Sequence, residues 1–166
     1  MISAVKNKRE SYEKNGPDDT LISEMFEDKQ FTDEEIVNET ITLFFAGIDT
    51  TGHLLGAIMY VFGHHPEYQI KIVDEFREKM KCNSDITINN LKDENLPFVN
   101  AIIHETLRLY TPATSLFLRQ CIKNTKLGRF NIEKGTILYI TPYVSSQNPQ
   151  YFENPEVYDP SRWINN

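Results

Sequence analysis

The chain has 166 residues, of which 40% are hydrophobic and 25% are charged, and its formal net charge is −7. This composition is that of a globular domain, and a chain of this length buries about 70% of its unfolded surface. The negative charge excludes the basic stripe by which proteins neutralise nucleic-acid phosphates, so we expect no nucleic acid among its partners.

The two cysteines, Cys82 and Cys121, lie far apart and belong to no Cys-x-x-Cys or Cys/His cluster. We therefore expect neither a disulfide framework nor a structural zinc site, and a reducing compartment fits this pattern. Residues 1–16 lack the apolar centre of a signal peptide, and no uninterrupted apolar run reaches the roughly 18 residues of a transmembrane helix. We expect no membrane contact from this segment.

The first half of the chain predicts one very long helix. Residues 1–30 are charged and weakly patterned, and they predict a tail, a turn and a short helix. Thr32 and Glu35 then form a capping box, so we expect a long helix over residues 31–65 to begin at Thr32. Between Ile41 and Val61 that helix is apolar on every side, which is typical of a helix buried inside a larger body.

Two amphipathic helices are predicted next. Residues 66–82 carry apolar side chains at spacings of three and four, and a proline suits their first turn. Their charged side chains, Glu75 among them, are expected to be solvated. Residues 96–111 form the third predicted helix, which Pro112 ends.

The last part of the chain changes to a strand-like pattern. Short β-branched and aromatic runs over residues 115–142 predict a small β region with bends at Gly128 and Gly135. Residues 143–166 hold three prolines and several aromatics, which predicts an irregular but packed tail. The expected fold class is therefore mainly α with a small β portion.

A carboxylate and hydroxyls stand in the middle of the long apolar helix, in the segment AGIDTT at residues 46–51. Burying such groups is costly unless something uses them, and Gly47 adds about 1 kcal/mol of helix penalty relative to alanine. In one interpretation Ala46 and Gly47 let a flat group approach the backbone and Thr50 bonds the Ala46 carbonyl. Asp49 and Thr50 are then placed to pass protons. In the other interpretation the segment is a hydrated polar notch in an ordinary core helix.

Glu105 and Arg108 lie three residues apart on one side of the third helix, where they can form an ion pair. If the pair is exposed, it is worth less than about 1 kcal/mol. If the carboxylate is buried and shared with the guanidinium of Arg162, it attaches the tail to the helix. The spacing leaves both interpretations open.

Arg119 lies in an apolar run, and its charge is satisfied either by a ligand carboxylate or by solvent on an edge strand. Cys121 is expected to be an inert core thiol. The histidines that we assign to structure are His53, His64 and His65.

Three motifs in this order resemble the cytochromes P450. AGIDTT is similar to the oxygen-activation motif in the long central helix of that family, ETLR at residues 105–108 to its Glu-x-x-Arg helix, and PSRW at residues 160–163 to its Pro-x-Arg-Phe segment. The resemblance extends from about Asp19 to Trp163. It implies that residues 1–166 are a partial cytochrome P450 domain, from a haem-dependent monooxygenase that inserts one oxygen atom of O₂ into an organic substrate.

The resemblance also implies a role for each candidate residue. Asp49 and Thr50 take the acid and alcohol roles in proton delivery during oxygen activation. Ala46 and Gly47 adjoin the haem, Arg119 binds one of its propionates, and no residue is assigned as a metal ligand. The remaining groups are a structural triad of Glu105, Arg108 and Arg162 and a substrate-facing set of Phe45, Thr114, Ser115 and Leu116.

The partners implied by the resemblance are a small apolar organic substrate, O₂ and a redox partner such as an NADPH-dependent reductase. Full-length relatives are often anchored in the endoplasmic-reticulum membrane. For this segment the expected location is the reducing, intracellular side.

The chain departs from the family pattern at two places. Ser146 stands where many members carry a histidine, and the glycine-rich loop with the haem-ligating cysteine has no counterpart before Asn166. Because that thiolate drives the oxygen chemistry, we expect the chain by itself to bind haem weakly or not at all and to be inactive. The alternative is a non-enzymatic helical interaction protein or a remnant of a P450, which leaves Asp49 without a role.

Overall fold

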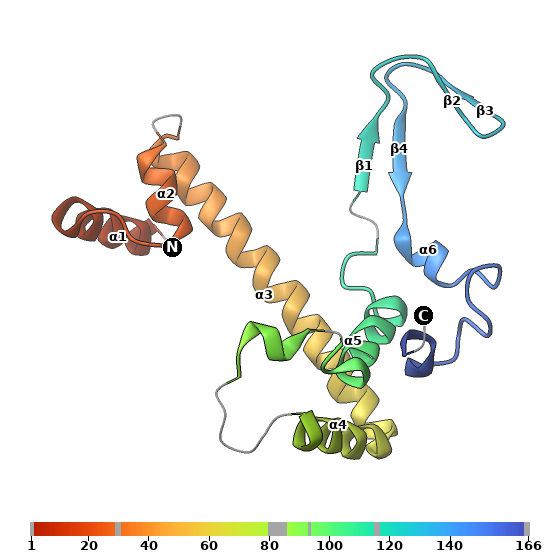
Figure 1. The fold of residues 1–166 in the computed structure, drawn as a ribbon. Coiled ribbons are helices and arrows are strands. Elements are labelled where there is room, and N and C mark those ends of the chain that lie inside the picture. The colour runs from red at the N-terminus through yellow and green to blue at the C-terminus, as the bar shows by residue number, and fades with distance from the viewer. Residues whose placement is uncertain (1, 29–30, 80–85, 93, 115–116, 165–166) are drawn as a thin grey trace. The chain divides into compact units, whose positions relative to one another are not determined.

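The computed structural model forms two compact units, residues 1–51 and 52–166. The sequence predicted a single partial domain. The contacts separate because no described helix or strand packs on the middle of the long helix α3 (Asp33–His64), which belongs to both units. The structure describes residues 2–28, 31–79, 86–92, 94–114 and 117–164 (Figure 1).

The first unit begins with a helix where the sequence predicted a tail. α1 (Ile2–Asn15) packs on α2 (Leu21–Glu27), and Val5 of α1 is only 4% exposed. The Arg9 guanidinium lies 4.2 Å from the centroid of the Phe26 ring. The tail prediction was wrong because Lys, Arg and Glu are good helix formers, and the buried Val5, the Arg9 cation–π contact and the edge-to-face contact of Tyr12 with Phe26 hold the charged helix on its neighbour.

The start of α3 confirms the predicted capping box. The backbone N–H of Thr32 donates to Glu35 Oε2 at 2.8 Å, and the backbone N–H of Glu35 donates to Thr32 Oγ1 at 3.3 Å. The bonds from the Thr32 backbone and side chain lower the pKa of Glu35. Ile36, one residue later, is fully buried and anchors this end of α3 in the first unit.

The middle of α3 is not covered by the described residues. Phe44 is 58% exposed, Phe45 69% and Ile48 56%. A helix that is apolar all round needs a covering surface on every side, and none of the described residues supplies one. Its burial inside a larger body therefore stays a prediction.

By length and composition α3 could also cross a membrane, and it is the one described helix that meets those criteria. The core helix of a soluble protein meets the same criteria. The absence of a membrane contact therefore stays a prediction.

α5 (Pro97–Leu109) is the centre of the second unit (Figure 1). It packs on α4 (Pro66–Lys79), on α6 (Pro142–Ser146) and on the 3₁₀ helix η2 (Pro160–Trp163). A further 3₁₀ helix, η1 (Ile88–Leu91), was not predicted. The buried residues at and along α5 are Leu96, Ala101, Ile102, Glu105, Thr106 and Arg108.

The sequence predicted that all the charged side chains of α4 are solvated, but one of them is not. Glu75 is half-buried and accepts hydrogen bonds from the backbone N–H groups of Phe98 and Val99 in α5. The prediction was wrong at Glu75 because helical periodicity reports a face of α4 but not which neighbouring helix end lies opposite it.

The β region consists of two separate two-stranded antiparallel sheets. Figure 1 shows β1 beside β4 and the β2–β3 hairpin between them in the chain. Gly128 and Gly135 have φ values of 55° and 92°, so both predicted bends are at glycines in the left-handed region. The strands are β1 (Phe117–Gln120), β2 (Thr125–Leu127), β3 (Phe130–Ile132) and β4 (Ile137–Ile140).

The tail after the β region contains short helical turns, α6 and η2, where the sequence predicted irregular structure. The prediction missed them because turns of four or five residues are too short to show a helical period. Tyr158 ties this tail to α5: its hydroxyl lies 2.8 Å from Thr106 Oγ1 and donates to the Ile102 carbonyl at 3.1 Å. Burial raises the pKa of Tyr158 to about 12.

Candidate functional site

The AGIDTT segment is regular helix in the structure, and Thr50 makes the expected bond within it. Thr50 Oγ1 donates to the carbonyl oxygen of Ala46 at 2.6 Å, one helical turn earlier. This bond satisfies the hydroxyl inside an apolar helix without a partner from elsewhere. Asp49 is exposed and Thr50 half-exposed, so the buried carboxylate that the sequence predicted is not buried by the described residues.

The small residues of this segment leave room beside the helix. A Cβ atom added at Gly47 would meet nothing within 4 Å apart from its chain neighbours and the adjacent helix backbone, as at the other glycines of α3. Ala46 and Phe45 are exposed, so the haem-facing and substrate-facing residues expected on α3 are all accessible in the first unit. This stretch offers a broad apolar surface with one carboxylate and two threonine hydroxyls beside it.

The remaining haem and substrate candidates lie in the second unit. Arg119, in β1, is exposed and pairs across the sheet with Leu138, and its Nη1 donates to the Leu118 carbonyl at 2.8 Å. Thr114 is exposed. Ser115 and Leu116 lie outside the described residues. Arg119 and Thr114 therefore belong to a different unit from Asp49 and Thr50.

Glu105 is the centre of a buried charge cluster on α5. Its side chain is 0% exposed and accepts two bonds from Arg108: Nε donates to Oε2 at 2.8 Å and Nη2 to Oε1 at 2.7 Å. Arg162 Nε approaches Oε1 at 3.4 Å. The structure thus brings together the three residues of the expected triad, and the Glu105–Arg108 pair is buried rather than solvated.

All five N–H donors of the Arg108 guanidinium have partners. Two bonds go to Glu105 and three go to backbone carbonyls of the tail, those of Ser146 at 2.9 Å, Pro155 at 2.6 Å and Val157 at 3.0 Å. The planar fork of an arginine can satisfy several acceptors at once, whereas a lysine has three donors on one atom. Arg108 therefore fixes three points of the irregular tail to α5.

Arg162, itself in the tail, binds two further backbone carbonyls of the tail. Its Nη1 donates to the Glu153 carbonyl at 2.5 Å and its Nη2 to the Asn154 carbonyl at 3.0 Å. Asn154 has φ 45°, a left-handed conformation that asparagine tolerates better than most residues. The tail is thus folded around the two guanidiniums.

Two partners of Glu105 were missed by the sequence analysis. Trp163 Nε1 donates to Oε2 at 2.9 Å, and the backbone N–H of Asp159 donates to Oε1 at 2.8 Å. Trp163 adjoins Arg162 in the PSRW motif, which was the one signal available for it. No sequence pattern identifies a backbone donor such as that of Asp159.

The pKa of Glu105 lies below its ordinary value. Burial acts to raise it, but the hydrogen bonds from Arg108, from the Asp159 backbone and from Trp163 outweigh burial. The hydrogen bonds from Ser161 likewise lower the pKa of Asp159, against the opposing effect of burial. Both carboxylates are therefore held in the charged form.

We expect the stability of the fold to fall in acid through these two groups. Their folded pKa values lie below the unfolded ones, so their stabilising contribution is complete above the ordinary glutamate pKa of 4.5 and is lost as the pH falls through the folded values. Urea unfolding followed from neutral pH to below pH 4.5 measures this loss. A Glu105→Gln variant should show a shallower decline, and an equal slope in both proteins would contradict the assignment.

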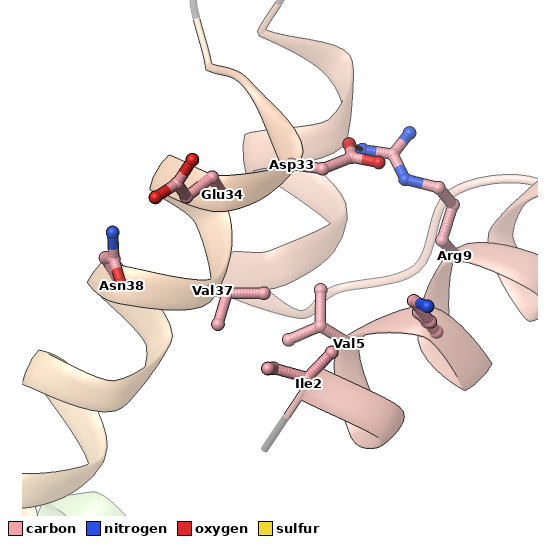
Figure 2. Close-up of a pocket in the computed structure, with 8 residues that line it drawn as sticks. Ile2, Val5, Arg9, Asp33, Glu34, Val37 and Asn38 are labelled. Carbon is pink, nitrogen blue, oxygen red and sulfur yellow. Dashed lines mark hydrogen bonds and ion pairs between the residues drawn. The ribbon is translucent and has the colours of Figure 1, made fainter.

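A cavity of about 380 Å³ lies between α1 and the first turns of α3, within the first unit. Figure 2 shows Ile2, Val5 and Val37 on its apolar side and Arg9 directed at Asp33, with which it forms an ion pair. None of the expected site residues lines this cavity. It is therefore separate from the AGIDTT surface.

Two of the histidines that the sequence assigned to structure make local contacts. His64 Nδ1 lies 3.0 Å from the Tyr60 carbonyl, and His65 stacks on Tyr68 with ring centroids 4.9 Å apart. Cys121 is a free, half-buried thiol, and Cys82 lies outside the described residues. In the part of the chain that the structure describes, no group of three or more His, Cys, Asp or Glu side chains is placed to hold a metal ion.

Comparisons by sequence and by structure both match this chain to cytochromes P450. A family model described as Cytochrome P450 matches residues 1–166. Cytochrome P450 4F4 of Rattus norvegicus is 38% identical over 148 residues, which are 87% of this chain and 28% of that protein. Leukotriene-B4 omega-hydroxylase 3 of Mus musculus is 35% identical over 161 residues, 96% of this chain and 30% of that protein.

A solved structure of a zebra fish cytochrome P450 with abiraterone has a TM-score of 0.83 to this chain. The alignment covers 99% of this chain and 42% of that one at 20% identity, so it establishes the fold alone. The curated relatives are far longer, and the chain spans about 30% of their length. Its mainly helical fold with small sheets is part of the cytochrome P450 fold, and the chain belongs to the cytochrome P450 family.

Proposed function

We propose that this chain is part of a haem-dependent monooxygenase, for which it provides the long central helix and the Glu105 cluster. The match of the family model over all 166 residues carries the proposal. When bound, haem supplies the chemistry that inserts one atom of O₂ into an organic substrate. The residues of this chain contact the cofactor and substrate, move protons and hold the fold.

The middle of α3 fits a flat apolar cofactor. Space is open beside Gly47, and Ala46 adds only a methyl group. The exposed rings of Phe44 and Phe45 and the Ile48 side chain gain about 25 cal/mol for each Å² of apolar surface that is covered. We therefore assign Ala46 and Gly47 to contact with haem, and Phe45 to contact with substrate.

Asp49 and Thr50 are assigned to proton transfer. The Asp49 carboxylate is exposed, so it can exchange protons with water. The Thr50 hydroxyl gives its hydrogen to the Ala46 carbonyl, which leaves its oxygen lone pairs to accept from a water molecule. Such a pair can orient water and relay a proton, a task for which placement matters more than acid strength.

Arg119 is assigned to a carboxylate of the cofactor. The Leu118 carbonyl takes one of its five N–H donors, and the planar fork suits bidentate binding of a propionate. Thr114 stays assigned to the substrate side, as do Ser115 and Leu116, which lie outside the described residues. Glu105, Arg108 and Arg162 are assigned a structural role because they bind backbone rather than an open surface.

The substrate proposed is a long, apolar molecule oxidised at its terminal carbon. One relative from Mus musculus is named a leukotriene-B4 omega-hydroxylase. An aliphatic chain requires an apolar surface to bind to, and the exposed side chains around Phe45 provide one. A reductase that draws on NADPH is the proposed electron donor, and the reducing side of an intracellular membrane is the proposed location.

The full-length protein, loaded with haem, provides the test. After reduction and treatment with CO it should show the absorption band after which the family is named. With NADPH, a reductase and leukotriene B4, it should release a product that carries one atom from isotopically labelled O₂. A folded protein that takes up haem but shows no such band contradicts the proposal, as does a reading frame after Asn166 without a Phe-x-x-Gly-x-Arg-x-Cys-like stretch.

A further inference from the structure

The first turn of α5 lacks a cap from its own sequence. The first N–H groups of a helix have no partner within the helix, and a side chain at the N-cap position normally satisfies one of them. The N-cap residue of α5 is Leu96, which makes no side-chain capping bond, and no acidic residue lies in the first turn. Because the first turn of α5 is half-buried, its N–H groups require partners from elsewhere.

α4 supplies those partners through one side chain. Glu75 Oε1 accepts the backbone N–H of Phe98 at 2.8 Å, and Glu75 Oε2 accepts that of Val99 at 2.9 Å. Pro97 has no N–H, and the N–H of Asn100 already reaches the Leu96 carbonyl at 3.0 Å. Every donor of the first turn is therefore satisfied, and the negative charge lies at the positive end of the helix dipole.

Ring and cation contacts hold the same two helices together. The Tyr68 and Phe98 rings meet edge to face with centroids 5.9 Å apart, and Lys71 Nζ lies 5.4 Å from the centroid of Phe98. Tyr68 and Lys71 precede Glu75 on α4, so three of its residues meet the first turn of α5. The carboxylate is therefore held at the end of a packed interface rather than at a mobile tip.

The opposite end of α5 carries the Glu105 cluster. The helix is thus fixed by charge at both ends, through Glu75 at its first turn and through Arg108 at its last. A shift along the helix axis at one end displaces the other, because an α-helix is stiff over three or four turns.

We propose that Glu75 is a positioning residue: its carboxylate caps α5 from α4 and so sets where α5 presents Glu105 to the tail. The link to catalysis rests on the proposed function, whereas the cap itself does not. Glu75→Gln keeps the shape of the side chain but leaves one acceptor and no charge.

Amide hydrogen exchange of the full-length protein at single-residue resolution tests the cap. Glu75→Gln loses one of the two bonds and removes the charge that strengthens the other, so exchange at Phe98 and Val99 should accelerate at least about tenfold. Glu78→Gln is the matched control, because Glu78 is on the same helix, is 74% exposed and pairs only with Lys79 among the described residues. Exchange at Phe98 and Val99 that is equal in the two variants overturns the cap.

Positioning is tested at a distance from the cap. The Asp159 amide bonds Glu105, so its exchange should also accelerate in Glu75→Gln, and less of the haem-loaded variant should show the reduced CO band. If Asp159 and the band match those of Glu78→Gln, Glu75 is a local cap and the positioning role is overturned. An absent band in the unmodified protein contradicts the proposed function and leaves the exchange comparison intact.

If the Glu75→Gln protein fails to fold, amide exchange of the unmodified protein tests the cap instead. Its Phe98 and Val99 amides should then be as protected as the amide of Ile102, which lies inside the helix. First-turn amides without partners exchange freely. Exchange of these two amides at the rate of an unstructured peptide overturns the proposal.

Discussion

Replacing Glu105 by glutamine should lower the free energy of unfolding by about 3 kcal/mol or more. The change leaves Arg108 and Arg162 without their shared counter-charge in a site where Glu105 is 0% exposed. It also turns one carboxylate oxygen into an NH₂ group, which cannot accept: the Asp159 backbone bond is lost if Oε1 is replaced, and the Trp163 bond is lost if Oε2 is replaced. Urea unfolding of the full-length protein, followed by circular dichroism, measures the loss.

Glu156→Gln is the matched control for this prediction. Glu156 is an exposed carboxylate in the same tail, between Pro155 and Val157, two of the three residues whose carbonyls bind Arg108. A surface substitution of this kind should change the free energy of unfolding by less than about 0.5 kcal/mol. If Glu105→Gln were no more destabilised than Glu156→Gln, the buried cluster would not hold the tail.

Replacing Asp49 by asparagine should reduce turnover of the full-length, haem-loaded protein about 100-fold. Asparagine occupies the same volume but neither takes up nor releases a proton, so the relay assigned to Asp49 and Thr50 loses its acid. The exposed position of Asp49 means that the fold should tolerate the change. Product formation per haem, compared with consumption of NADPH, measures the loss.

The control for Asp49→Asn is Glu39→Gln, an exposed carboxylate near the start of the same helix. It removes one negative charge from α3 outside the AGIDTT segment and should leave turnover unchanged. The reduced CO band should stay intact in both variants. Equal turnover in both variants, or a lost band in Asp49→Asn, would remove proton transfer as the role of Asp49.

Local patterns in the sequence were read correctly where their partners lie a few residues away. The capping box joins Thr32 and Glu35, and Thr50 bonds Ala46 within one helical turn. The bends at Gly128 and Gly135 are also local, because the backbone conformation there favours glycine. Such features depend on helix and turn geometry alone, so a sequence contains all the information they require.

The sequence left open what surrounds each pattern. The spacing of Glu105 and Arg108 fits an exposed pair as well as a buried one, and the structure decides for the buried pair. The reverse holds on α3, where an apolar pattern predicted burial but the described residues leave Phe45 69% exposed. Burial depends on which other surfaces are present, and periodicity within one helix carries no information about them.

The sequence by itself determined the family, through three motifs in a fixed order, and the start of the central helix. The tertiary structure alone decided that Glu105 meets Arg162, 57 residues away, and that Glu75 caps a helix 23 residues away. The physical reason is separation along the chain. Bonds within one turn follow from backbone geometry, whereas the partner of a distant charge depends on the path of the whole chain and on the desolvation that packing imposes.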